Sequence, residues 1–144
     1  MPEALGPRAE RGTTSRGLGR VLVALYATLA LAATARAAVQ LSTRFDEAPL
    51  AYLLSAFAAV VYVVATVALA RGGRTGRRTA TVALSVELAG VLIVGALSLA
   101  DQAAFPDETV WSAFGRGYGF LPLVLPVLGL FWLRRQARQA AVTS

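Results

Sequence analysis

One acidic residue lies inside a long apolar stretch of this sequence and is the strongest candidate for chemistry. Glu87 is the only charged residue in the run 79–100, which otherwise holds apolar, small and hydroxyl residues. A carboxyl group is costly to ionise in hydrocarbon, so we expect it to be neutral unless a cation is close. Such a residue marks a functional site by default, with proton transfer, cation binding or an interhelical hydrogen bond as its chemistry.

Two hydroxyl residues share the predicted depth of Glu87. Glu87, Tyr62 and Thr28 each lie eight or nine residues from the arginine that flanks their apolar run. At the helical rise this places all three roughly 13 Å from that boundary. We therefore predict an inner polar layer in which Tyr62 or Thr28 hydrogen-bonds Glu87. A purely structural role is the alternative, because hydrogen bonds between membrane helices contribute only about 0.6 kcal/mol on average.

A second polar layer is predicted nearer the opposite surface. Arg36, Ser55 and Tyr118 are each 16 residues from their flanking arginine, roughly 24 Å by the same rise. Pro122 cannot donate to the Tyr118 carbonyl, so we expect Arg36 to bond that carbonyl. Asp101 is the alternative partner for Arg36, closer to the surface.

Composition excludes several kinds of site. The chain has no Cys and no His, which removes disulfides, Cys/His zinc sites, His-ligated haem and Cys-His or Ser-His-Asp nucleophiles. The net charge is +6 and all 14 basic residues are Arg. These arginines flank apolar runs without an aromatic-basic surface, so we expect membrane orientation signals and no nucleic acid partner.

The apolar runs predict an all-α polytopic membrane protein. The charged share is 15% and the mean hydropathy +0.60, whereas a soluble domain carries about 25% charged residues. A helix needs about 20 residues to cross the hydrocarbon, and four runs reach or approach this length. We expect two antiparallel helical hairpins between a disordered basic tail and a second basic tail. The predicted segments are the first tail 1–20, the four-helix domain 21–133 with spans 21–41, 49–70, 79–100 and 117–133, and the second tail 134–144.

The arginines also predict the orientation. With both termini in the cytoplasm, 11 of the 14 arginines lie inside, in the two tails and the link 71–78. Frequent Ala, Val, Gly and Arg in place of Ile, Lys and Asn suggest a GC-rich bacterial genome, and hence the inner membrane. A basic start followed by the small-residue string 35–38 also resembles a cleaved secretory signal. We expect a retained first span, but cleavage would leave three.

The outer loop 101–116 predicts a short helix. Val110, Trp111 and Phe114 would share one face, lying at the headgroup level where Trp is favoured. An ordinary loop with an anchoring Trp is the alternative. Small residues in the third run are expected to permit close helix approach; they are Ser85, Ala89, Gly90 and Gly95.

The second half of the chain resembles a known group of proteins. The segment 114–135, Phe-Gly-Arg-Gly-Tyr-Gly-Phe-Leu-Pro-Leu-Val-Leu-Pro-Val-Leu-Gly-Leu-Phe-Trp-Leu-Arg-Arg, is similar to the last span of small, uncharacterised integral membrane proteins of actinobacteria. The segment 86–90, Val-Glu-Leu-Ala-Gly, is similar too. This resemblance implies four membrane helices and no known activity. Small multidrug exporters share the size and an intramembrane Glu, but theirs lies in the first helix.

We therefore expect an accessory, structural or assembly component of the inner membrane. The alternative is a small transporter or an ion- or proton-coupled channel that uses Glu87. We expect no enzymatic activity, cofactor or metal, because Glu87, Tyr62 and Tyr118 alone are too few groups for a catalytic site. The expected partners are the lipid bilayer and either further copies of the chain or a larger membrane complex.

Overall fold

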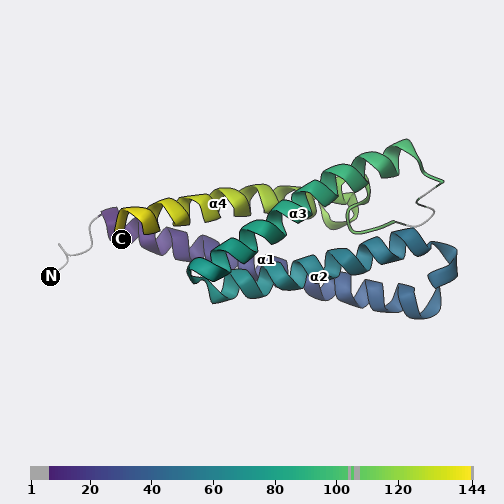
Figure 1. The fold of residues 1–144 in the computed structure, drawn as a ribbon, viewed down its shortest axis with the longest axis horizontal. Coiled ribbons are helices and arrows are strands. Elements are labelled where there is room, and N and C mark those ends of the chain that lie inside the picture. Colours follow the sequence, from purple (N-terminus) through teal and green to yellow (C-terminus); the bar gives the residue numbers. More distant parts are fainter. Residues whose placement is uncertain (1–6, 104, 106–107, 144) are drawn as a thin grey trace.

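Helices form the fold of this chain. The computed structural model describes residues 7–103, 105 and 108–143, and within this part every regular element is a helix (Figure 1). In chain order the elements are α1 Pro7–Thr43, the short 3-10 helix η2 Phe45–Glu47, α2 Pro49–Arg71, α3 Gly73–Ala100, the 3-10 helix η3 Ser112–Tyr118 and α4 Leu121–Thr143.

The apolar helices confirm the predicted all-α polytopic fold. Within the described residues α1, α2 and α3 are each long and apolar enough to cross a membrane, and η3 with α4 forms a fourth, bent candidate span. Only 44% of the most apolar stretch of α2 is buried inside the bundle. Large side chains such as Leu31 and Phe131 also face outward. An outward surface this apolar is suited to lipid and unsuited to water.

Each helix packs on its neighbour in the sequence. The α1–α2 pair makes the most extensive contact, followed by α2–α3 and α3–α4, whereas α1 and α4 touch over a small area. α1 begins and α4 ends at the same end of the bundle (Figure 1). There Gly19 lies under the indole of Trp132, where a Cβ atom would be 2.8 Å from the ring. Gly19 thus allows α4 to approach α1.

The first helix begins earlier than predicted. Residues 7–20, expected to be disordered, continue α1 back to Pro7, and residues 1–6 lie outside the described residues. Disorder was predicted because this segment is rich in glycine, and each glycine destabilises a helix by about 1 kcal/mol. Extending an existing helix needs no new nucleus, and Pro at its start is favourable. The helix therefore tolerates these glycines.

The link between α2 and α3 is also more helical than predicted. Gly72 is the only residue between the two helices; its φ is 65° and its N–H bonds the Ala68 carbonyl. A residue with positive φ ends a helix most easily when it is Gly, which has no Cβ atom. Because α3 begins at Gly73, the arginines of 71–78 lie on helical turns.

The fourth predicted span, 117–133, is displaced along the chain. α4 begins only at Leu121, and η3 is bent by 96° from it. Left-handed backbone at Gly119 and Phe120 breaks the helix between them, and Pro122 can start a helix but not continue one. Tyr118 therefore belongs to η3. At its other end α4 runs on to Thr143, so the predicted basic tail is helical over 134–143.

Candidate functional site

The carboxyl group of Glu87 lies in the centre of the bundle. Its side chain is fully buried, and the Tyr26 hydroxyl donates a hydrogen bond of 2.7 Å to Oε2. Oε1 is buried without a hydrogen-bond partner among the described residues. The bond joins α1 to α3, two helices that are not neighbours in the sequence. Glu87 thus connects the first and second hairpins.

Tyr26, and not Thr28, is the partner that α1 supplies. Thr28 is exposed and its hydroxyl bonds the Ala24 carbonyl of its own helix, so this part of the predicted layer is wrong. The residue count fixed depth along the helix but not direction around it, and two residues turn a helix by about 200°. The buried positions of α1 recur every three or four residues, which is the signal that identifies Tyr26. They include Leu22, Tyr26, Leu29, Ala33, Ala37 and Gln40.

Tyr62 lies beside this pair and is bonded to a residue of the outer loop. The Trp111 indole donates to the Tyr62 hydroxyl over 2.9 Å. The centroid of the Tyr62 ring lies 6.2 Å from the centroid of the Tyr26 ring and 6.5 Å from that of the Trp111 ring. Tyr62 therefore lies next to Tyr26, but its own hydrogen-bond partner is Trp111 and not Glu87.

Trp111 lies in the core of the bundle and not at the headgroup level. Only 1% of its surface is exposed, and its ring packs edge-on against Phe57 at 6.0 Å. It contacts α3 at Gly90, ten residues before the end of that helix and so roughly 15 Å below it. Residues 108–111 are not helical. Over 108–111 the expected interfacial helix is thus replaced by a loop that turns back into the bundle, whereas residues 104, 106 and 107 lie outside the described residues.

Two glycines of α3 make room for this loop. A Cβ atom at Gly90 would lie 2.5 Å from the Trp111 ring, and one at Gly95 would collide with Phe114. The small residues of the third run were expected to bring helices together. At these two positions they admit aromatic side chains of the loop instead.

Short polar side chains accept hydrogen bonds from backbone N–H groups of the loop. Ser112 Oγ accepts from the Thr109 N–H over 2.8 Å, Thr109 Oγ1 accepts from the Trp111 N–H, and Ser98 Oγ accepts from the Ala113 N–H. Irregular backbone is tolerated at membrane depth only where protein surrounds and pairs it. Ala113 and the following residue Phe114 are left-handed, a conformation that costs non-glycine residues roughly 1–2 kcal/mol each. The packing of Trp111 and Phe114 offsets this cost.

Arg36, the central residue of the predicted outer layer, bonds a residue of the outer loop. The Arg36 guanidinium donates over 2.6 Å to the main-chain carbonyl of Glu108, so the expected bond to the Tyr118 carbonyl is wrong. Tyr118 lies in η3, half-buried against the core. Ser55 is buried and its hydroxyl has no partner among the described residues. Asp101 caps the end of α3 in an exposed position.

Glu87 is enclosed by the bundle, where it accepts a hydrogen bond from Tyr26. Four of the grooves on the described surface are lined by other residues, and neither Glu87 nor Tyr26 lines these four. Trp111 and Tyr62 cover the pair from the side of the outer loop. The described residues include no group of three or more acidic side chains that could hold a metal ion.

Comparisons with protein-family models, with curated proteins and with solved structures find no match for this chain. The resemblance to small actinobacterial membrane proteins therefore stays a prediction. The fold and the buried site define the class: this is a small polytopic membrane protein in which a loop residue and three helices meet around one intramembrane carboxyl group.

Proposed function

We propose that this chain is an accessory, structural or assembly component of a bacterial inner membrane, with both termini in the cytoplasm. The observation that carries the proposal is the enclosed state of Glu87. Its carboxyl group is fully buried, accepts a bond from Tyr26 and lies next to the Tyr62–Trp111 pair. A residue that moves ions needs contact with a hydrated cavity or pathway. In this arrangement Glu87 instead orders the helices.

The apolar outer surface supports the same role. Much of α2 and α3 faces outward, including Val63, Ile93 and Leu97. Such a surface accepts lipid or the helices of a partner equally well, because lipid tails and apolar side chains have similar polarity. A rigid bundle with this surface is suited to assembly with another membrane protein or with further copies of itself.

A second candidate is a transporter or an ion- or proton-coupled channel that uses Glu87. The unpartnered Oε1 favours it, because a buried polar atom without a hydrogen bond costs about 1–3 kcal/mol. A proton, a cation or a hydrated state reached by movement of the Trp111 loop would satisfy this atom. The left-handed backbone at Ala113 and Phe114 also stores strain in the segment that would move.

Two measurements on the same preparations separate these functions. The chain is tagged at native expression level, cross-linked and purified in mild detergent, and the purified protein is also reconstituted in liposomes with a pH-sensitive dye. For the accessory role we expect a stoichiometric partner in both wild type and Glu87→Gln, and no proton or Na⁺ flux above that of empty liposomes. Gln keeps the hydrogen-bonding shape without titrating.

Flux in the wild type that disappears in a folded Glu87→Gln variant would refute the accessory role and establish the transporter. Thr28→Val is the matched control, because it alters a hydroxyl at similar depth that lies outside the site.

A further inference from the structure

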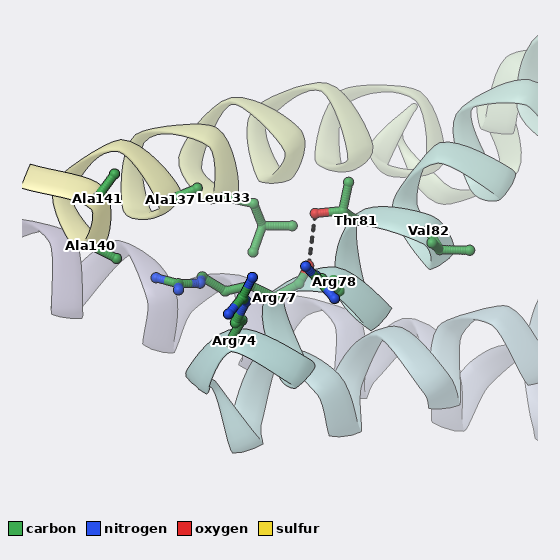
Figure 2. Close-up of a pocket in the computed structure, with 9 residues that line it drawn as sticks. All are labelled: Arg74, Arg77, Arg78, Thr81, Val82, Leu133, Ala137, Ala140 and Ala141. Carbon is green, nitrogen blue, oxygen red and sulfur yellow. Dashed lines mark hydrogen bonds between the residues drawn. The ribbon is translucent and has the colours of Figure 1, made fainter. Parts of the chain in front are cut away.

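We propose that the basic groove between α3 and α4 binds the phosphate headgroup of an anionic phospholipid, one of whose acyl chains occupies the adjoining apolar groove between α2 and α3. The basic groove is a cavity of about 840 Å³. Figure 2 shows Arg74, Arg77 and Arg78 on the α3 side and the alanines of α4, including Ala137 and Ala140, on the facing wall.

Among the described residues, no carboxylate compensates the charge of this groove. Arg74 and Arg78 are exposed and make no ion pair or hydrogen bond among the described residues, and no carboxylate lines the groove. Arg77 is half-buried and donates to the Gln136 carbonyl over 3.3 Å, which holds it across the groove between the two helices. Three guanidinium groups in one concave site favour a phosphate, which arginine binds through paired donors.

The groove lies at the predicted headgroup level. The three arginines directly precede the apolar run that begins at Thr79, and Leu133 on the facing wall ends the apolar run of α4. α3 begins at Gly73 without a side-chain cap, so the three arginines lie within the first two turns of the helix, near the positive end of its dipole. Clusters of about four to eight basic residues that directly adjoin a membrane helix are typical sites for anionic lipid headgroups, and the segment 71–78 holds four arginines.

A second groove makes a phospholipid a better occupant than free phosphate. A cavity of about 430 Å³ between α2 and α3 shares Arg78 and Val82 with the basic groove. Its remaining lining is largely apolar and includes Val60, Val64 and Val86. From Arg78 to Val86 it follows α3 for roughly 12 Å into the hydrocarbon level. Charge beside an extended apolar groove matches an amphiphile with a phosphate and an acyl chain.

Native mass spectrometry of the purified full chain tests this assignment. The probes are phosphatidylglycerol, phosphatidylcholine and the water-soluble glycerol 3-phosphate. We expect phosphatidylglycerol to stay bound and the other two to dissociate. The triple variant R74Q/R77Q/R78Q should bind phosphatidylglycerol on the order of 100-fold more weakly, since each arginine near the surface contributes about 1 kcal/mol. The matched control R134Q/R135Q/R138Q removes equal charge from the same end of the bundle and should retain binding.

A second variant guards against misfolding of the first. Ala137→Glu keeps all three arginines and adds a carboxylate at an exposed position of the facing wall. We expect it to lose phosphatidylglycerol binding while circular dichroism shows unchanged helicity. Equal loss in the R134Q/R135Q/R138Q control, or retention in both groove variants, would overturn the site. Equal binding of glycerol 3-phosphate would overturn the lipid assignment. Lipid binding requires only that the bundle spans a membrane and does not depend on the accessory role.

Discussion

Substituting Gly90 by Ala tests whether the outer loop enters the bundle. The new methyl would lie 2.5 Å from a Trp111 ring carbon, whereas carbon atoms prefer separations of about 3.5–4.0 Å. The ring must therefore move by roughly 1 Å. Such a shift would stretch the 2.9 Å bond from Trp111 to Tyr62 beyond the usual hydrogen-bond range. The ring cannot move freely, because Phe57 packs against it.

The net effect is a balance of three contributions. Overpacking costs about 1–3 kcal/mol, and loss of the Trp111–Tyr62 bond costs about 1 kcal/mol. Replacing a helical Gly by Ala returns about 1 kcal/mol. We therefore expect Gly90→Ala to destabilise the protein by about 1–3 kcal/mol. Gly17→Ala is the matched control, because nothing lies within 4 Å of its Cβ position in α1, and only the helical gain remains.

The assay is thermal unfolding in detergent followed by circular dichroism, together with tryptophan fluorescence. A Trp132→Phe background leaves Trp111 as the only indole, since the chain has two. We expect Gly90→Ala to lower the midpoint and shift the Trp111 emission to longer wavelength, and Gly17→Ala to do neither. If Gly90→Ala stabilised the protein as Gly17→Ala does, with unchanged emission, Trp111 could not lie against α3.

Tyr26→Phe should lower the free energy of unfolding by about 0.6 kcal/mol, with an upper bound near 1.7 kcal/mol. Thr28→Val should change it little, because that hydroxyl bonds only its own helix. Equal effects of the two variants in chemical denaturation would contradict this assignment. Arg36→Leu should cost about 1 kcal/mol through loss of its carbonyl bond. It should combine additively with Pro122→Ala in a double-mutant cycle, and a coupling energy would restore the partner predicted from the sequence. A reporter fused to the C-terminus should be active only in the cytoplasm, and one inserted in the loop 101–103 only outside; the reverse pattern would contradict the orientation.

The long apolar helices could be predicted from the sequence, because they depend on counts along consecutive residues. The apolar runs identified α2 and the apolar parts of α1 and α3, since spanning length and charge placement are properties of consecutive residues. The same count placed Glu87 and Tyr62 in one layer, and the structure brings them into the same cluster. A lone carboxyl group inside an apolar run needs no alignment to be noticed.

Direction around each helix and the path of the outer loop were decided only by the tertiary structure. The count could not distinguish Tyr26 from Thr28, because both satisfy the same depth and differ in the face they occupy. The insertion of Trp111 depends on Gly90, Ser98 and Tyr62, which lie far from it in the sequence but supply the space and the polar partners. A Trp can lie at the headgroup level or in the core of the bundle, and the residue type does not distinguish the two locations. Only packing against the other helices distinguishes them.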